Sequence, residues 1–253
     1  MLERLTVPPS AQAAAVRLWL GRSDDSAGRA ADWALLDPGE RARALAITDV
    51  RVRSRYVAAR AGIRRVLGTE LGVAAESLEW GRLPCPRGCG SPAHGRPSLR
   101  RPEHGPEVGV SRSGAWWLLG VCDSGPLGVD LEAAEQGGGL VGAAAARRCF
   151  SARERRWLDG LPPADRPAAL LRGWVRKESV SKAWGLGLGA ELRAVEVLAG
   201  AWPPGAVQAT VGGGGGPHRA GWLVEDLTVP DGLTAALARP VLPEPGPPAS
   251  GDA

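Results

Sequence analysis

Two acidic residues in the segment LGVDLE are spaced so that they could hold a metal ion. Asp130 and Glu132 are separated by the apolar Leu131. On a β-strand, residues two apart leave the same face, so both carboxylates would point one way and Leu131 the other. Two neighbouring carboxylates repel each other unless a cation lies between them, and Mg²⁺ prefers carboxylate oxygens. An exposed strand end with two solvated acids is the alternative interpretation.

A second group of reactive residues lies in the segment WVRKESVSKAWG, residues 174–185. Lys177 and Lys182 are the only lysines of the chain, and Glu178 lies between them. On a helix, Glu178 and Lys182 are one turn apart and therefore neighbours. A surface ion pair is the simpler interpretation, but the flanking tryptophan and valine predict partial burial, where unpaired charge is unfavourable. If Glu178 meets the strand pair, the acids and ammonium groups form a candidate site for Mg²⁺ and phosphate.

These two groups need a strand and a helix to hold them, and the sequence predicts both. Residues 107–132 predict three strands joined by short turns, which would form a β-meander. Residues 166–185 predict a helix that ends at a glycine. An earlier amphipathic stretch, residues 38–71, predicts one long helix or two helices broken near Asp49.

Further strands are expected between residues 193 and 240, so helix followed by strands occurs twice in the chain. This order predicts an α+β fold with two halves, residues 1–113 and 114–240. The segment 241–253 is rich in proline, glycine and serine and is expected to be a disordered tail.

The overall composition is that of a folded protein. The chain has 253 residues, of which 44% are hydrophobic, enough to form a core. No stretch of about 20 apolar residues is present, and charges interrupt the first apolar residues, so we expect a cytoplasmic protein without a membrane span or signal peptide. The net charge of +4 favours an anionic partner, which could be phosphate, nucleic acid or an acidic protein.

The four cysteines do not predict a disulfide scaffold, because four in a chain of this length without a secretion signal indicate reduced thiols. Cys85, Cys89 and His94 could offer ligands to zinc. A structural turn is the simpler interpretation, because the spacing is not that of a standard zinc finger and no fourth ligand is evident.

The order of the motifs resembles one family of enzymes. GVDLE at 128–132, followed by WVRKESVSK at 174–182, is similar to the paired signature of the 4′-phosphopantetheinyl transferases, in their larger surfactin-synthetase-activating (Sfp-like) class. Other segments that resemble the family are LDPGERARA at 36–44, GRP at 95–97, VSRSG at 110–114 and CFSARERRWL at 149–158.

The resemblance implies two similar α+β halves related by a pseudo-two-fold axis, with the active site in the cleft between them. It also implies the reaction: a serine hydroxyl of an apo acyl or peptidyl carrier protein attacks coenzyme A, takes its 4′-phosphopantetheine group and releases 3′,5′-ADP, with Mg²⁺ as cofactor. The expected partners are acidic carrier proteins, without nucleic acid or membrane, and the protein is expected to be a monomer.

Roles for individual residues follow from the same resemblance. Asp130, Glu132 and Glu178 would coordinate Mg²⁺. Lys182 would contact the pyrophosphate of coenzyme A, and Lys177 would lie beside the metal-binding acids. Glu178 is the candidate base for the serine proton.

The nucleotide of coenzyme A would be bound mainly by arginines. Arg112 stands where the family has a histidine, and its planar guanidinium suits phosphate oxygens. The expected contacts are Arg41, Arg43 and Arg55 near the 3′-phosphate, Arg96 and Ser111 along the adenine nucleotide, and Arg112 at a phosphate.

Two other functions would use the same residues. A Mg²⁺-dependent phosphohydrolase of nucleotide or coenzyme-A-like substrates would need the same three acids, with water as the nucleophile. A non-enzymatic nucleic-acid-binding protein would explain the basic stretch 41–65, but aromatic residues are not interleaved with it. The S-x-x-K spacing of Ser179 and Lys182 also occurs in serine hydrolases, whose K-T-G motif is absent here.

Overall fold

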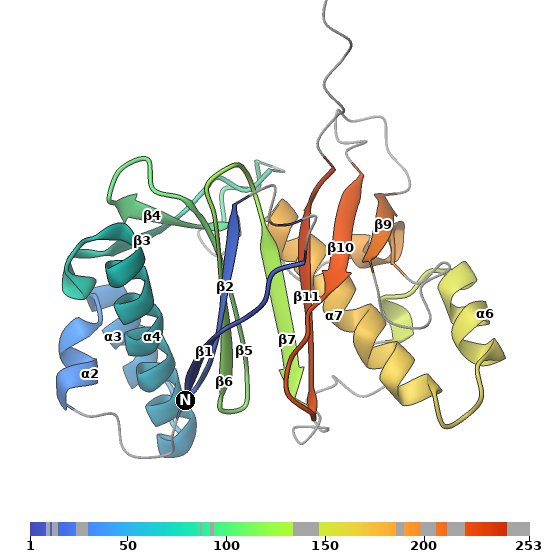
Figure 1. Cartoon of the computed structure of the whole chain (residues 1–253), viewed down its shortest axis with the longest axis horizontal. Coiled ribbons are helices and arrows are strands. Elements are labelled where there is room, and N and C mark those ends of the chain that lie inside the picture. The colour runs from blue at the N-terminus through green and yellow to red at the C-terminus, as the bar shows by residue number, and fades with distance from the viewer. Residues whose placement is uncertain are drawn as a thin grey trace, which may run out of the picture.

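The computed structural model describes residues 1–8, 11, 15–23, 30–86, 88–91, 94–133, 147–185, 190–197, 206–211 and 221–241. The expected disordered tail lies outside these residues from position 242 onward. Within them the fold is α+β, as predicted, with sheets at the centre and helices on both sides (Figure 1). No helix in the described part of the chain is long and apolar enough to cross a membrane.

Three antiparallel sheets make up the β-structure of the described residues. The first sheet contains, in spatial order, β1 (Leu2–Arg4), β2 (Val16–Arg22), β6 (Trp116–Cys122) and β5 (Glu107–Ser113). The second contains β7 (Gly128–Ala133), β11 (Leu233–Pro240), β10 (Trp222–Asp226), β9 (Ala206–Val211) and β8 (Val195–Glu196). A separate ribbon pairs β3 (Glu79–Arg82) with β4 (Pro97–Arg101).

The helices flank the two larger sheets (Figure 1). On the side of the first sheet lie α2 (Ala30–Leu35), α3 (Pro38–Leu45) and α4 (Val50–Leu71), followed by the 3₁₀ turn η1 (Ala75–Ser77). On the side of the second sheet lie α6 (Ala152–Gly160), α7 (Arg166–Trp184) and the 3₁₀ turn η3 (Ala190–Ala194).

Local sequence signals explain where these helices begin and end. The predicted break near Asp49 is confirmed, because the Asp49 carboxylate caps α4 by accepting a hydrogen bond from the Val52 N–H at 3.0 Å. Asp37 and Glu40 form a capping box at the start of α3. Helix α7 ends at Gly185, whose φ of +85° favours glycine.

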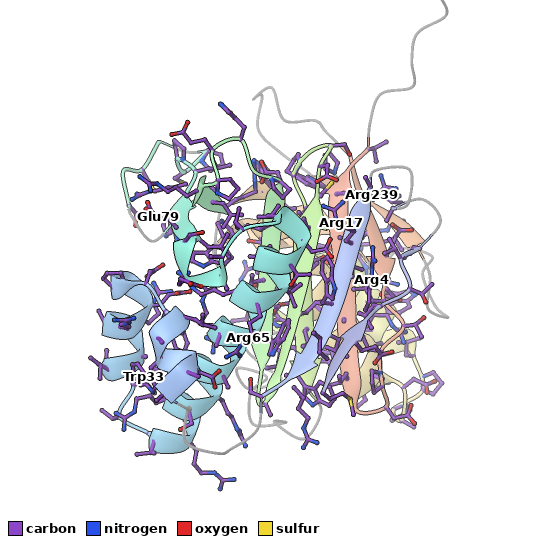
Figure 2. The ribbon with its side chains drawn as sticks, turned by 60° about the vertical axis from the view of Figure 1, so that its left-hand side comes forward. Arg4, Arg17, Trp33, Arg65, Glu79 and Arg239 are labelled. Atoms are coloured by element: carbon purple, nitrogen blue, oxygen red, sulfur yellow. The ribbon has the colours of Figure 1, made fainter. Side chains whose placement is uncertain are left out.

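Ion pairs fasten the helices to one another and to the first sheet. Arg17 on β2 lies 3.1 Å from Glu70 at the end of α4 and 2.6 Å from Asp123. Figure 2 labels Arg17 on the ribbon. Arg65 on α4 pairs with Asp32 on α2 at 2.6 Å. Many of the basic residues of the first half therefore hold the fold together.

The hydrophobic core lies in layers on either side of each sheet. The side chains of α4, among them Ile63 and Leu67, pack against one face of the first sheet. Val129 and Leu131 of β7 pack against Leu18 and its neighbours in the first sheet, so these two strand residues face away from α7. The alternation predicted for LGVDLE is thereby confirmed, and the intervening acids face α7.

The expected three-stranded meander is wrong in its last strand. Strands β5 and β6 form the predicted hairpin, but β7 pairs with β11 in the second sheet. Serine side chains of β5 hydrogen-bond to the backbone of β7 and so join these two strands. The Ser111 hydroxyl accepts from the Leu131 N–H at 3.2 Å, and the Ser113 hydroxyl accepts from the Ala133 N–H at 3.1 Å.

The arrangement of the strands bears on the division into halves. The first sheet draws its strands from residues up to Cys122, and the second begins at Gly128. The predicted boundary between residues 113 and 114 falls at the turn of the β5–β6 hairpin. The two halves and their pseudo-two-fold relation stay predictions.

Strand β7 lies so close to α7 that Gly128 cannot carry a side chain. A β carbon there would overlap the Ser179 carbonyl oxygen and the Ala183 backbone nitrogen. Because both atoms belong to the helix backbone, neither can rotate aside. We expect Gly128→Ala to lower the free energy of unfolding by about 1–3 kcal/mol or more.

Urea unfolding followed by circular dichroism measures this effect. Gly160→Ala in α6 is the matched control, because a β carbon there meets nothing within 4 Å. This control should leave the protein equally stable or slightly more stable. Equal stability of the two variants would show that β7 and α7 are not in backbone contact.

Candidate active site

The acidic face of β7 meets the last turns of α7 and forms one connected polar site. The Lys182 ammonium donates to the Asp130 carboxylate at 2.6 Å and to the Ser111 hydroxyl at 2.8 Å. The Ser111 hydroxyl in turn donates to Asp130 at 2.8 Å. Three residues predicted for the site, which are far apart in the sequence, are thus in direct contact.

Glu132 lies beside this group on the same face of β7. Its carboxylate accepts a hydrogen bond from the Ser113 hydroxyl at 2.7 Å. Burial raises the pKa of Glu132, and the negative charge of Asp130 raises it further. Hydrogen bonds from Ser113 and Trp174 and the charge of Lys182 oppose this rise in pKa without cancelling it.

Glu178 completes the group from the helix side. Its side chain is buried, and burial raises its pKa to about 7. The charge of Asp130 acts in the same direction, followed by that of Glu132, while Lys182 lowers the pKa of Glu178. The site therefore brings three carboxylates near one ammonium group, which contacts Asp130, and the side chains of Asp130 and Glu178 are buried.

The residues present fit a divalent cation. One oxygen of Asp130 and one of Glu178 are buried without a hydrogen-bond partner among the described residues. Buried carboxylate oxygens of this kind are ligands that a hard cation prefers. In the described structure the three carboxylates, those of Asp130, Glu132 and Glu178, do not all lie within 4.8 Å of one another. Lys182 is bound to one oxygen of Asp130.

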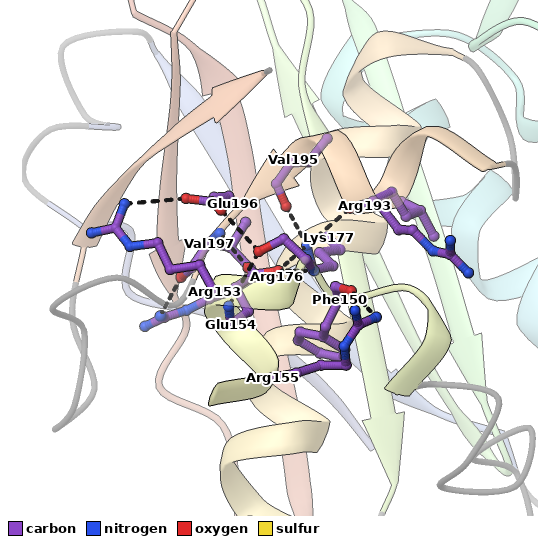
Figure 3. A network of polar contacts seen from close by, with 12 residues as sticks. Phe150, Arg153, Glu154, Arg155, Arg176, Lys177, Arg193, Val195, Glu196 and Val197 are labelled. Atoms are coloured by element: carbon purple, nitrogen blue, oxygen red, sulfur yellow. Dashed lines mark hydrogen bonds and ion pairs between the residues drawn. The ribbon is translucent and has the colours of Figure 1, made fainter. Parts of the chain in front are cut away.

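The structure places Lys177 in a different environment from Lys182. Its ammonium lies 2.7 Å from the Glu154 carboxylate and donates to the carbonyls of Leu192 and Val195 (Figure 3). Burial lowers the pKa of Lys177, and Glu154 opposes that shift. This lysine holds α6 and the segment after α7 against the helix, so the geometry does not support the catalytic role predicted for it beside the acids.

A cleft of about 870 Å³ runs from Lys182, beside the acidic site, to the arginine-rich helices of the first half, and Asp130, Glu132 and Glu178 are not among its lining residues. Lys182 and Gly185 line its wall at the end of α7. Arg43 and Arg60 line it from α3 and α4, and Arg82 lines it from the β3–β4 ribbon. The cleft thus runs between residues from both parts of the chain.

The guanidinium groups in and beside this cleft repel one another. Burial lowers the pKa of Arg82, and the charges of Arg43 and Arg60 lower it further. Desolvation by neighbouring residues also lowers the pKa of Arg112, although part of its side chain is exposed; Arg60 and Arg43 lower this pKa further, whereas Tyr56 opposes the shift. The Arg112 guanidinium lies over the ring of Tyr56, 4.8 Å from its centre.

The arginines in and beside the cleft have fewer acidic partners than positive charges. Arg60 pairs with Glu40 and stacks on Trp80, 4.3 Å from the ring centre. For Arg43, Arg82 and Arg112, the described part of the chain provides no ion pair with a carboxylate. A group of cations without acidic partners is an electrostatic site for an anion.

The other predicted nucleotide contacts, Ser111 and Arg112 included, lie outside the lining of the cleft. Arg96 pairs with Glu107 at 3.0 Å. Arg41 is exposed and donates to the Ala34 carbonyl at 3.1 Å, and Arg55 is half-buried on α4. Of the arginines expected at the 3′-phosphate, the structure therefore brings only Arg43 to the cleft.

Sequence reasoning missed Arg60 and Arg82. Arg82 directly precedes the glycine- and proline-rich loop that contains the GRP segment, so its position was an available signal. Arg60 is one of many arginines on α4, and no local feature distinguishes it. Only the fold shows that it lies with Arg43 and Arg82.

Comparison with known families supports one interpretation of this site. Residues 126–237 match the model of the 4′-phosphopantetheinyl transferase superfamily. The match spans the second sheet with α6 and α7, and so includes the acidic site. No match to a curated protein was found. The match supports transferase activity in general, while the motifs of the first half lie outside it.

The raised pKa of Glu178 predicts a pH dependence of stability. The folded protein keeps the Glu178 proton up to about pH 7, whereas a glutamate of ordinary pKa, 4.5, loses it earlier. Stability therefore falls as the pH rises from 4.5 to 7 and stays lower above pH 7. A shift of this size corresponds to about 3 kcal/mol, and Glu178→Gln should remove this part of the dependence.

Urea unfolding at pH 5 and pH 8, in the presence of a chelator, tests this prediction. Groups remote from Glu178 titrate alike in both proteins, so the difference between wild type and Glu178→Gln reports Glu178 together with its coupling to Asp130, Glu132 and Lys182. Glu103→Gln, at an exposed position, should keep the wild-type dependence. The same pH dependence in Glu178→Gln and wild type would contradict the raised pKa.

Proposed function

We propose that the protein transfers the 4′-phosphopantetheine group of coenzyme A to a serine of an apo acyl or peptidyl carrier protein and releases 3′,5′-ADP. The observation that carries this proposal is a cleft lined by cations at both ends. Lys182, which pairs with the buried Asp130, lines one end, and Arg43 and Arg82, which have no ion pair with a carboxylate in the described part of the chain, line the other. Coenzyme A carries a pyrophosphate and a separate 3′-phosphate, which two such ends can bind.

At the acidic site beside Lys182, Asp130, Glu132 and Glu178 would hold Mg²⁺. The bound ion would supply positive charge against the pyrophosphate oxygens. The unpartnered oxygens of Asp130 and Glu178 support this assignment, because they leave buried negative charge that a cation would neutralise.

Lys182 and Glu178 then have separate tasks. The Lys182 ammonium binds a pyrophosphate oxygen and stabilises the charge on the departing 3′,5′-ADP. Glu178 takes the proton of the carrier serine as its oxygen attacks phosphorus. Burial raises the pKa of this carboxyl, and a bound Mg²⁺ would lower it.

At the basic end, Arg43, Arg82 and Arg112 bind the 3′-phosphate. An anion there relieves the mutual repulsion of the guanidinium groups, and charge-assisted hydrogen bonds to phosphate fix the nucleotide. Arg112 takes the place of the family histidine as a cation beside this phosphate. The class within the superfamily, the Sfp-like one, belongs to the same proposal.

The net charge of +4 suits an acidic carrier protein as partner, since opposite charges favour encounter. Monomeric state and cytoplasmic location stay predictions.

The structure weakens the case for nucleic-acid binding. Several arginines of the basic stretch 41–65 are engaged within the protein. Arg64 is fully buried and pairs with Asp37 and Glu40 at 2.7 and 2.6 Å. A continuous basic surface for a nucleic-acid backbone is therefore reduced.

Mass spectrometry of apo-carrier proteins incubated with coenzyme A and Mg²⁺ tests the transfer. We expect a mass gain of roughly 340 Da on the carrier, the mass of the transferred group. Release of 3′,5′-ADP from coenzyme A without any carrier would favour the phosphohydrolase instead. Duplex binding that survives Glu178→Ala, with no transfer by the wild type, would favour a nucleic-acid-binding protein.

Removal of either central acid should abolish the transfer. We expect Asp130→Ala and Glu178→Ala to lower its rate by roughly a hundredfold or more, because each removes a ligand for the charge-stabilising ion. Glu103→Gln should be as active as the wild type. Circular dichroism confirms folding, and full activity of either alanine variant would refute the role of the acidic site.

The basic end makes a separate prediction. Arg82→Gln or Arg43→Gln should raise the KM for coenzyme A by roughly tenfold or more, because a charge-assisted hydrogen bond to phosphate is lost. The KM for dephospho-coenzyme A, which lacks the 3′-phosphate, should be unchanged.

Arg65→Gln, outside the cleft, is the control for both substrates and should leave both KM values as they are. Equal effects of Arg82→Gln on the two substrates would place the 3′-phosphate elsewhere.

A further inference from the structure

Three more metal-ligating side chains lie together in the loop between β3 and β4, apart from the acidic site. One ligand atom each from Cys85, Cys89 and His94 lies within 4.8 Å of the other two. Cys89 Sγ and His94 Nδ1 are 3.1 Å apart and share a hydrogen bond. Around a tetrahedral Zn²⁺, with bonds of about 2.0–2.3 Å, neighbouring ligand atoms are roughly 3.5 Å apart. These atoms are therefore close to the spacing that zinc requires.

The loop backbone is folded to bring the two thiols to one place. The Gly88 N–H donates to the Cys85 carbonyl at 2.8 Å and closes a turn between the cysteines. Gly88 and Gly90, on either side of Cys89, have φ values of +62° and +68°. Other residues rarely adopt such values, so this backbone path depends on glycine at both positions.

Packing does not explain the group. Cys89 and His94 are exposed, so burial of apolar surface does not drive them together. The two cysteines are separated by three residues, which is within the range found at zinc sites, although the histidine is not placed as in a standard zinc finger. Sulfur and imidazole ligands favour zinc, whereas the carboxylates of the acidic site favour magnesium.

We propose that Cys85, Cys89 and His94 bind a zinc ion, with water in the fourth position. Binding uses two thiolates and a neutral imidazole, so both thiol protons are released to solvent. The charges of two thiolates and Zn²⁺ cancel, and the centre adds no positive charge to the neighbouring arginines. In the described part of the chain, no further cysteine, histidine or acid joins this group, which leaves water as the fourth ligand.

The ion would fix one wall of the cleft. Cys85 and His94 line the cleft. The residue after His94, Gly95, is hydrogen-bonded to two other residues of the cleft wall. The Gly95 carbonyl accepts a hydrogen bond from Arg82 at 2.8 Å, and the Gly95 N–H donates to the Gly185 carbonyl at 3.0 Å. Closing the loop with zinc therefore steadies Arg82 and the contact with the end of α7.

Metal analysis of the full chain, purified without a polyhistidine tag and kept reduced, tests the proposal. Inductively coupled plasma mass spectrometry should find zinc in an equimolar amount. Protein stripped with a chelator and reconstituted with Co²⁺ should show the charge-transfer and visible bands of thiolate-bound, tetrahedral cobalt. Hydrogen exchange in peptides covering residues 84–95 should be faster in the stripped protein than after zinc is restored.

The control variants separate a specific site from general thiol binding. Cys89→Ser and His94→Asn should each lose the zinc while circular dichroism shows a folded protein, and Cys149→Ser should keep it. A wild-type protein that binds neither zinc nor Co²⁺ after reduction would overturn the proposal. A Cys85–Cys89 disulfide in its place, or equal loss of zinc in Cys149→Ser, would do the same. None of these measurements depends on transferase activity, so the zinc site and the proposed function stand or fall separately.

Discussion

The contact between the backbones of β7 and α7 at Gly128 determines the geometry of the acidic site. Because no side chain separates strand and helix there, the next residues on the same face of the strand, Asp130 and Glu132, are held directly against Glu178 and Lys182. Such closeness excludes water, and exclusion of water is the main cause of the raised pKa of Glu178. If strand and helix were farther apart, water would reach the same residues, and Glu178 would have the pKa of an ordinary glutamate.

Local periodicity was enough to predict the parts of the site that lie within one element. The alternation of LGVDLE placed Asp130 and Glu132 on one face, and helical spacing placed Glu178 beside Lys182. The arginine cluster could not be predicted in this way, because Arg43, Arg60 and Arg82 come from three elements. Their meeting depends on how α3, α4 and the β3–β4 ribbon pack, which no single segment of sequence encodes.

The two lysines show the limit of reasoning from neighbours in sequence. Lys177 directly precedes Glu178, but adjacent residues of a helix point about 100° apart. Lys177 therefore turns toward Glu154, while Lys182 meets Asp130. The partners of Lys177 are one carboxylate and two carbonyls, which match the three donors of an ammonium group. A planar guanidinium could not replace it there, and this explains one lysine in a chain otherwise rich in arginine.

The hydroxyls of Ser111 and Ser113 lie between the two large sheets and bind groups of β7, and that of Ser111 also accepts a hydrogen bond from Lys182. Each accepts from a backbone N–H of β7 and donates to a carboxylate of the acidic site. An alanine at either position would open the contact between the two sheets and release the acid in one step. In a mutational scan, substitution of these serines would therefore lower activity as much as substitution of a catalytic residue, although we assign neither hydroxyl a step in the reaction. Positions ranked by loss of activity would then include the contact between the two sheets as well as the reaction centre.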